Sequence, residues 1–455
     1  MKKTGILLGI FLALFAFVYF YEYRGGLERE KAREQESLFL RINDDDVESI
    51  TLVQEGRDTL AYVRSGPDGN TWYIVSPVAT SAEESSIRAN VRTFADARTK
   101  RRWSVKRESL ADFGLDPPEA EVLIKKKDGT EKHLLVGKET ATRGDIFVAL
   151  MDGEGDEDSV DVLVTTNTVR VQATKSLFDL RDKKIAHFDD TRVNKVELNW
   201  NGTDIVLEKP GGKWSMAAPR DLPLDESRIR GFLRSLKNYS ARTFVSEEWE
   251  DGKPYGFDRP SVRIRLTLGE EQSTKEIVVG KLDEKEEGYY AHESGRTPVF
   301  VIRESTRNTL TKDPFYFEEK KLVGTEKEEI REIRFSGAYR WTLVREDTLG
   351  WYAHGDTTLK VDPSRINRLH SNLRSLRVTD LVTYEPGDLA NYGLRIPFLE
   401  VVLTGTKGEE EGFEIGDGFN DNRYVKRRDY PYVYSLPVSQ VERITRWLEE
   451  LAEAE

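Results

Sequence analysis

The residues best suited to metal or acid–base chemistry are five histidines: His133, His187, His292, His354 and His370. No two of them have the i, i+4 spacing that puts two metal ligands on one helix face, and none belongs to an HExxH motif. The chain also lacks a complete phosphate loop and a G-x-S-x-G nucleophile elbow. The sequence therefore predicts a non-enzymatic protein with no cofactor.

Two acidic runs, Asp152 to Asp161 and Gly416 to Asn422, carry oxygen ligands of the kind that calcium prefers. The candidate ligands are Asp152, Asp156, Asp158, Asp417 and Asp421. Neither run has the spacing of an EF-hand loop, and runs of Gly, Asp and Asn also make ordinary hairpin turns. We favour turns, with calcium as the alternative.

The densest basic segment is KRRWSVKR, Lys100 to Arg107, with five cations around Trp103. Such a segment can contact lipid head groups or an acidic partner. A solvated edge strand is the favoured interpretation, because charges on an edge block strand-to-strand aggregation.

Composition narrows the class of protein. In 455 residues, 69 Lys and Arg are outnumbered by 81 Asp and Glu, giving a net charge of −12, so nucleic acid is not an expected partner. The absence of cysteine excludes disulfides, thiol nucleophiles and Cys-ligated metals. At about 150 residues per domain, this length predicts three domains.

The N-terminus predicts a membrane anchor. Gly5 to Tyr21 is uncharged over 17 residues, about 25 Å as a helix, and Val18 to Arg24 is almost entirely large, which disfavours a signal-peptidase site. Lys2 and Lys3 favour a cytoplasmic N-terminus. We expect a cytoplasmic tip and transmembrane signal anchor at 1–24 and a charged stalk at 25–44. The apolar anchor residues are Gly5, Ile6, Leu7, Leu8, Ile10, Phe11, Leu12, Leu14, Phe15, Phe17, Val18, Phe20 and Tyr21.

An internal repeat organises the rest of the chain. Trp72, Trp214 and Trp351 recur at intervals of 142 and 137 residues. Isoleucine follows each tryptophan by 15 residues, and Gly114, Gly256 and Gly393 follow by 42. Because two spacings recur three times, we expect three copies of one module, with these tryptophans buried and the glycines in turns.

Each module combines strands that alternate apolar and polar residues with a helix whose apolar residues recur every three or four positions. The helix starts are expected at Ser81 with Glu84, at Asp225, and at Asp362 with Pro363. We predict an α+β protein: an N-terminal transmembrane helix, then three tandem β-rich modules with mainly antiparallel strands and one or two helices each. The modules are expected at 45–186, 187–323 and 324–455.

Motifs in the modules resemble the DUF4340 domain family. They are WYIVSP at 72–77, FGLDPP at 113–118 and LLVGK at 134–138, with weaker counterparts later, so the resemblance covers residues 47–455. The family resemblance implies a bacterial envelope protein. Together with the N-terminal segment, it leads us to expect the cytoplasmic (inner) membrane as its location, with the bulk facing the periplasm or cell exterior. The resemblance also implies a partnership with the permease and ATPase of an ABC transporter, and it supplies no catalytic residues.

The sequence thus favours a membrane-anchored extracytoplasmic interaction protein, an auxiliary subunit of an ABC transporter, that contacts the bilayer through residues 5–21. The alternative is a stand-alone protein that binds cell-wall glycan or lipid, for which repeated domains raise affinity through effective concentration.

Overall fold

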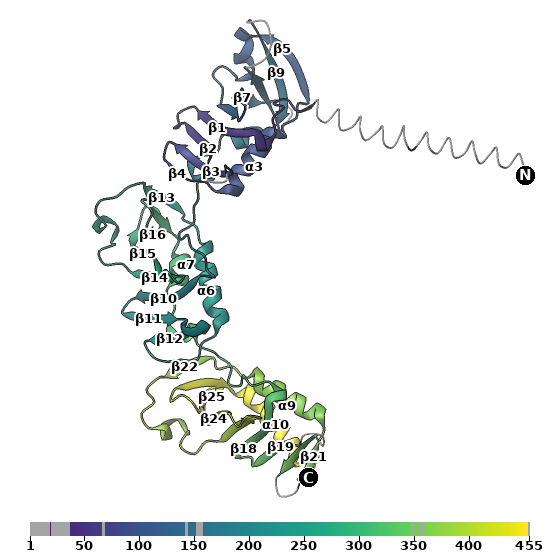
Figure 1. Cartoon of the computed structure of the whole chain (residues 1–455), viewed down its shortest axis with the longest axis vertical. Helices are drawn as coiled ribbons and strands as arrows, with labels where there is room; N and C mark the ends of the chain where they lie inside the picture. Colours follow the sequence, from purple (N-terminus) through teal and green to yellow (C-terminus); the bar gives the residue numbers. More distant parts are fainter. Residues whose placement is uncertain are drawn as a thin grey trace, which may run out of the picture.

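The computed structural model describes residue 19 and residues 37–65, 69–141, 144–151, 158–346, 350–354 and 358–453. The described chain forms three modules in a curved row, each built on one antiparallel sheet (Figure 1). Figure 1 also shows the main helices lying along the same side of the row.

The first module contains β1 (Val47–Gln54), β2 (Leu60–Ser65), β3 (Thr71–Ser76), β4 (Thr80–Ser81), α3 (Glu84–Ala95), β5 (Arg101–Lys106), β6 (Ala120–Lys126), β7 (Glu131–Glu139), β8 (Asp145–Leu150), β9 (Ser159–Thr166), α4 (Thr168–Ala173) and α5 (Leu177–Leu180). The second contains β10 (Val193–Trp200), β11 (Thr203–Glu208), β12 (Ser215–Ala218), α6 (Glu226–Asn238), β13 (Thr243–Ser246), β14 (Val262–Leu268), β15 (Ser273–Asp283), β16 (Gly288–Glu293), β17 (Val299–Ile302), α7 (Glu304–Leu310) and α8 (Pro314–Phe317). The third contains β18 (Ile330–Gly337), β19 (Trp341–Glu346), β20 (Gly350–His354), β21 (Thr358–Val361), α9 (Pro363–Ser375), β22 (Asp380–Thr383), β23 (Leu399–Gly405), β24 (Glu410–Phe419), β25 (Asn422–Arg427), β26 (Val433–Pro437) and α10 (Val438–Ala452).

The three sheets share one topology. In the first, the strand order is β4-β3-β2-β1-β6-β7-β8-β9-β5, and the third repeats this order; the second has eight strands and no counterpart of β4. The helix α3 connects β4 and β5, which are opposite edges of the sheet. It therefore crosses the whole sheet and covers one face of it with Ile87, Val91 and Phe94, all buried.

The predicted fold class was wrong. The described chain is mostly antiparallel β-sheet in three modules of eight or nine strands, with few helices, rather than α+β. Among the described residues, no helix is long and apolar enough to cross a membrane. Of the expected anchor, all but Tyr19 lies outside the described residues.

Two of the three expected helix starts are confirmed. The carboxylates of Asp225 and Asp362 accept backbone hydrogen bonds as N-caps of α6 and α9. The start expected at Ser81 was wrong, because Glu83 caps α3 through Ser85 and Ser86, while Glu84 accepts a 2.7 Å bond from the Trp72 amide. The sequence rule expects a short side chain such as that of Ser81 to cap the helix. It did not show that Glu84 bonds to the Trp72 amide.

The three tryptophans are buried, with 2%, 6% and 8% exposure for Trp72, Trp214 and Trp351. The recurring glycines form a close approach between a turn and a strand. Gly256 ends its turn with φ 79°, and a Cβ on Gly280 of β15 would lie 1.9 Å from the carbonyl oxygen of Tyr255. Gly137 and Gly416 approach the carbonyl oxygens of Phe113 and Tyr392 in the same way. The recurring spacing of 23 or 24 residues between the turn glycine and the strand glycine therefore reflects a backbone contact that side chains would block.

Candidate functional site

Modules 1 and 2 meet through a buried arginine of the connecting segment. The guanidinium of Arg181, which is 2% exposed, donates to both oxygens of Glu247 at 2.6 and 2.9 Å. The same guanidinium lies 3.5 Å from the ring centroid of Phe244 in β13. Two parallel hydrogen bonds and a ring contact fix both the distance and the orientation of this junction.

A histidine of the same connecting segment strengthens the junction. His187 lies between Asp182, at 2.6 Å from Nε2, and the fully buried Glu293 of β16, at 3.1 Å from Nδ1. The hydrogen bonds to Asp182 and then to Glu293 raise the pKa of His187 to about 9. At neutral pH the imidazolium therefore donates from both nitrogens.

Modules 2 and 3 meet through a buried carboxylate at the equivalent position. Glu318, 137 residues after Arg181, is 0% exposed and accepts a hydrogen bond from the Tyr434 hydroxyl. The hydroxyl of Tyr384, 137 residues after Glu247, lies 3.5 Å from the other oxygen. Burial raises the pKa of Glu318 and also of both tyrosines. The same position of the repeat thus holds a basic side chain, Arg181, at the first junction and an acidic one, Glu318, at the second.

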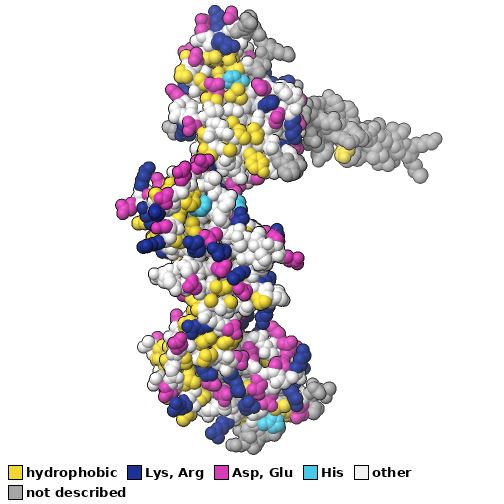
Figure 2. Space-filling view, turned by 60° about the vertical axis from the view of Figure 1, so that its left-hand side comes forward, with side chains coloured by type: hydrophobic (Ala, Val, Ile, Leu, Met, Phe, Trp, Pro, Cys, Tyr) yellow, Lys and Arg dark blue, Asp and Glu magenta, His cyan; other side chains and the backbone are white. Residues whose placement is uncertain are grey.

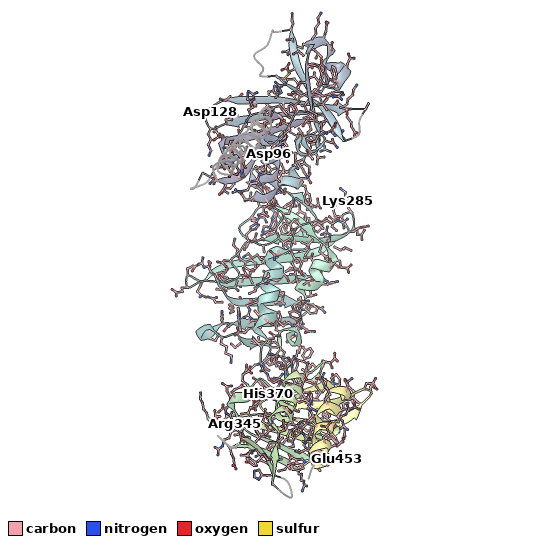
Figure 3. The ribbon with its side chains drawn as sticks, turned by 90° about the vertical axis from the view of Figure 1, so that its right-hand side faces the viewer. Asp96, Asp128, Lys285, Arg345, His370 and Glu453 are labelled. Atoms are coloured by element: carbon pink, nitrogen blue, oxygen red, sulfur yellow. The ribbon has the colours of Figure 1, made fainter. Side chains whose placement is uncertain are left out.

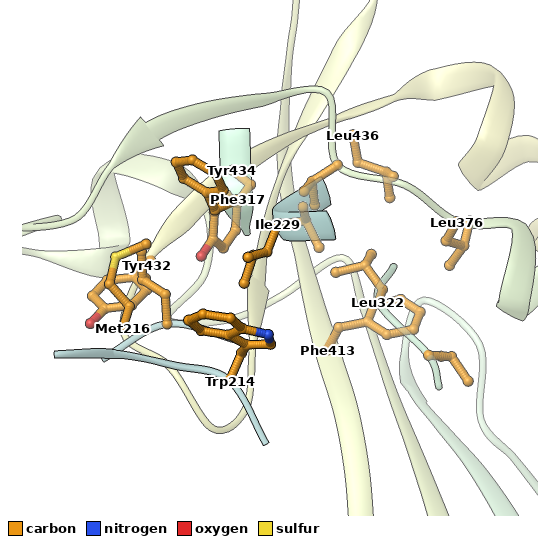
Figure 4. Packing of buried hydrophobic residues seen from close by; sticks show 14 of the residues in the cluster. Trp214, Met216, Ile229, Phe317, Leu322, Leu376, Phe413, Tyr432, Tyr434 and Leu436 are labelled. Atoms are coloured by element: carbon orange, nitrogen blue, oxygen red, sulfur yellow. The ribbon is translucent and has the colours of Figure 1, made fainter. Parts of the chain in front are cut away.

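The second junction also has an apolar core. Figure 4 shows Trp214 and Met216 of module 2 beside Tyr432 of module 3, and one hydrophobic cluster runs through both modules. The Tyr432 hydroxyl donates to the carbonyl oxygen of Asp221 at 3.1 Å. The core of module 1 is a separate cluster.

Each sheet carries a small aromatic cluster on the face away from its main helix. Alternation in β15 sends Ile277 and Val279 to the large core and Val278 to the aromatic side. An edge-to-face pair recurs in every module, with ring centroids 5.1, 5.2 and 5.1 Å apart. The pairs are Phe113 with Phe147, Tyr255 with Tyr290, and Tyr392 with Tyr424. All six rings are half-buried.

The aromatic cluster of module 2 borders a shallow cavity of about 600 Å³. Trp249 packs edge-to-face on His292, with centroids 4.9 Å apart, and the exposed Glu248 and Glu250 flank it. Arg296 and Thr297 complete the lining. Burial lowers the pKa of His292, so its ring is neutral at pH 7. Figure 2 shows hydrophobic side chains in separate patches on all three modules, with a histidine beside the patches of the upper and middle modules.

Half-exposed aromatic faces beside carboxylates and a cation suit a ligand with both apolar faces and hydroxyl groups, since stacking and hydrogen bonding then act together. Burial and a hydrogen bond to Asp283 raise the pKa of the neighbouring Tyr290 to about 12, so its hydroxyl keeps its proton.

Two other cavities lie elsewhere in the row. One of about 640 Å³ lies between modules 2 and 3, where Trp214, Asp221, Glu319 and Tyr430 are among the lining residues. Another of about 960 Å³ lies beside α3 in module 1 and is lined by four cations and four hydroxyl side chains, with Asp96. Figure 3 shows Asp96 within module 1.

The acidic residues proposed for calcium are not brought together. Asp152 and Asp156 lie outside the described residues, and Asp158 precedes β9. Asp417 lies against the Gly393 turn, and Asp421 is exposed. Within the part of the chain that the structure describes, no three His, Cys, Asp or Glu side chains form a group that could hold a metal ion.

The basic segment Lys100–Arg107 supplies β5, an edge strand that pairs only with β9 among the described strands, as the favoured interpretation expected. His370 is buried in module 3 (Figure 3), with Nε2 3.1 Å from the carbonyl oxygen of Thr325.

The sequence analysis missed the junction residues and Trp249. Trp249 has no tryptophan at the equivalent position of another module, so the repeat did not point to it. The exchange of Arg181 for Glu318 was visible, because the charged segments at 180–185 and 318–322 resemble each other.

Fold and repeated contacts together define a tandem-repeat protein of three β-rich modules. Three successive matches to the family model described as "Domain of unknown function (DUF4340)" cover residues 72–216, 214–358 and 351–454. The chain therefore belongs to the DUF4340 family. No curated protein and no solved structure matches it.

The family matches do not coincide with the modules. The first begins at Trp72 in β3 and ends at Met216 in β12, and the second runs from Trp214 to Thr358 in β21. Each of these two matches therefore includes one connecting segment, with Arg181 or Glu318, and the first hairpin of the next module. The connection between modules is thus part of the recurring unit.

Proposed function

We propose that this chain is a non-enzymatic interaction protein that presents three modules in a fixed row outside a bacterial cytoplasmic membrane, as an auxiliary subunit of an ABC transporter. The observation that carries the proposal is the pair of buried junctions at Arg181 and Glu318. A buried polar side chain with defined partners disfavours bending, because separation would leave a buried group without its hydrogen bond. Such a row can hold a partner at a set distance from its point of attachment.

The N-terminal sequence supports the proposed location. Residues 5–21 are uncharged and apolar, and Lys2 and Lys3 precede them. We propose that this segment attaches the chain to the bilayer and that the modules lie on the periplasmic side. The permease and ATPase as partners come from the family resemblance.

Co-purification tests the transporter role. Full-length protein, isolated from its native membrane in mild detergent, is expected to bring down a permease and its ATPase, identified by mass spectrometry. Arg181→Glu, which places two carboxylates together at the first junction, is expected to reduce their recovery. Arg230→Glu is the matched control, since Arg230 is exposed on α6 and pairs only with Glu226 among the described residues. If neither permease nor ATPase is recovered with the wild-type protein, the transporter role is wrong.

A second function, glycan binding, is favoured by one observation: the half-exposed Trp249 beside carboxylates in a cavity of about 600 Å³. Co-sedimentation with purified cell-wall sacculi measures it. Trp249→Ala is expected to abolish sedimentation, while Tyr73→Ala, a change of an exposed aromatic residue on β3, is expected to leave it intact. Equal sedimentation of both variants would remove this candidate.

A further inference from the structure

We call the end of a module at which the chain enters it the entry end. At this end, the strand that follows the main helix forms one edge of the sheet. Residues 37–39 pair with 97–99 through bonds of 2.8 and 3.3 Å, as 183–185 pair with 239–241 and 320–322 with 376–378. The edge strands at the three entry ends are β5, β13 and β22. Figure 1 shows β5 at the far end of the row.

The entry ends of modules 2 and 3 are covered by the preceding module. Phe244 of β13 packs against Phe178 of module 1, with ring centroids 6.3 Å apart. Leu381, the equivalent residue of β22, packs against the core shared by modules 2 and 3. This position of the edge strand therefore belongs to the surface on which the modules stack.

Module 1 has an arginine at the stacking position. Arg102 pairs with Leu163, as Phe244 pairs with Phe300 and Leu381 with Tyr434. Arg101 and Arg102 are both exposed, and no ion pair or hydrogen bond of their side chains occurs within the described part of the chain. At this stacking position module 1 thus has a charged side chain where modules 2 and 3 have apolar ones.

Neighbouring cations extend this surface. The cavity of about 960 Å³ next to β5 is lined by Arg88, Arg92, Arg98 and Lys100 together with Ser85, Thr93, Thr166 and Thr168. Carboxylates compensate part of the charge, since Lys100 lies 2.7 Å from Asp145 and Arg88 lies 3.3 Å from Glu84.

Module 3 is an internal control for the fold. Module 3 has Asn367, Ser371, Thr379 and Asp380 where module 1 has Arg88, Arg92, Lys100 and Arg101. The same topology forms in both modules, so the fold does not require these cations.

The chain that precedes this end has a defined reach. Between Tyr21, the last apolar residue of the N-terminal segment, and Ser37 lie 15 residues, which extend to at most about 50 Å. A membrane that takes up residues 5–21 is therefore within reach of the entry end of module 1.

We propose that the entry end of module 1, from the α3 cavity to Arg101 and Arg102, docks on the anionic phospholipid head groups of the membrane surface. Phosphate oxygens accept hydrogen bonds from guanidinium and hydroxyl groups, and polybasic surfaces near a bilayer gain from its negative potential. The membrane takes the place that a preceding module has at the other entry ends. The inference rests on the proposed attachment of residues 5–21.

The test uses the full chain reconstituted with vesicles of phosphatidylcholine alone or mixed with phosphatidylglycerol. Because the sequence has no cysteine, Asp112→Cys gives one dye site next to β5, and energy transfer to a head-group dye reports docking. Flotation of the vesicles separately reports attachment of the chain.

Energy transfer is expected to rise with phosphatidylglycerol and to fall with added salt. Arg101→Gln/Arg102→Gln is expected to lower the ratio of docked to undocked protein about 25-fold, at about tenfold per 1.4 kcal/mol and about 1 kcal/mol per cation. The control, Arg230→Gln/Arg234→Gln, alters the exposed arginines of α6 that correspond to Arg88 and Arg92, and should leave the ratio unchanged.

The outcomes separate the two proposals. If the chain floats with the vesicles while energy transfer depends neither on lipid charge nor on the Arg101/Arg102 change, the proposal of head-group docking is wrong. In that case the proposed attachment of residues 5–21 stands. If that change instead reduces recovery of a co-purifying protein without altering energy transfer, the surface binds a protein and the lipid proposal is overturned. If the chain floats with neither vesicle, both proposals fail.

Discussion

At the scale of single residues, the repeat separates what the fold needs from what a junction needs. Trp72, Trp214 and Trp351 are invariant and buried, whereas Arg181 becomes Glu318 and Glu247 becomes Tyr384. Each junction pair is complementary only within its own junction. We infer that this exchange fixes the order of the modules, because a mismatched pair would bury a charge without its partner.

Trp72→Ala is expected to lower the free energy of unfolding of module 1 by about 3–5 kcal/mol. The Trp72 ring packs edge-to-face on Tyr62, with centroids 5.8 Å apart, and the Arg64 guanidinium lies 4.9 Å from the ring centroid. Urea unfolding followed by circular dichroism measures the loss. Tyr73→Ala, one residue along and 38% exposed, is the control and should cost under about 1 kcal/mol. Equal losses for both variants would contradict the burial argument.

His187 is expected to make the first junction sensitive to alkaline pH. Its pKa is raised from 6.5 to about 9, so the folded state favours the proton and this stabilisation is complete below about pH 6.5. It is lost as the pH rises through 9. The difference in unfolding free energy between wild type and His187→Asn should therefore shrink from pH 6 to pH 9.5, by urea titration at each pH. A difference that does not change over this range would show that His187 contributes no charge to the junction.

At the scale of elements, the sequence predicted most of each module. Alternating strands and the helix starts at Asp225 and Asp362 follow from local rules. The predicted α+β class overestimated the share of helix in the fold, because one helix that crosses a whole sheet suffices to cover its face. The aromatic clusters were not predicted, since Trp103, Trp249 and Phe419 join them from different elements, and that proximity arises only when the sheet forms.

The close approach of turn and strand predicts opposite effects for two glycines of module 2. Gly280→Ala should destabilise by about 1–3 kcal/mol, because its Cβ would meet the Tyr255 carbonyl. Gly231→Ala, in α6 with no atom within 4 Å of a new Cβ, should stabilise by about 0.5–1 kcal/mol through helix propensity. Thermal unfolding of the two variants measures both signs. If Gly280→Ala leaves the free energy of unfolding unchanged, the turn moves away from β15 at little cost.

At the scale of the whole molecule, the two junctions differ in kind. The first is mainly charged, and the core of module 1 remains a separate cluster. The second is continuous, since one apolar cluster includes Trp214 of module 2, Leu322 of the connecting segment and Tyr432 of module 3. Cooperative units follow buried apolar contacts, so three modules should behave as two units.

Hydrogen exchange measured by mass spectrometry tests this division. Trp351→Ala removes a buried ring from module 3, and we expect faster exchange in β10–β17 as well as in β18–β26, because a shared core transmits the loss. Trp72→Ala should speed exchange in β1–β9 and leave modules 2 and 3 unchanged. If Trp351→Ala leaves the exchange rates of module 2 unchanged, modules 2 and 3 touch through the apolar cluster but unfold separately. The row would then be three independent units, and its fixed shape would depend on the polar contacts of the junctions, such as those of Arg181 and Glu318.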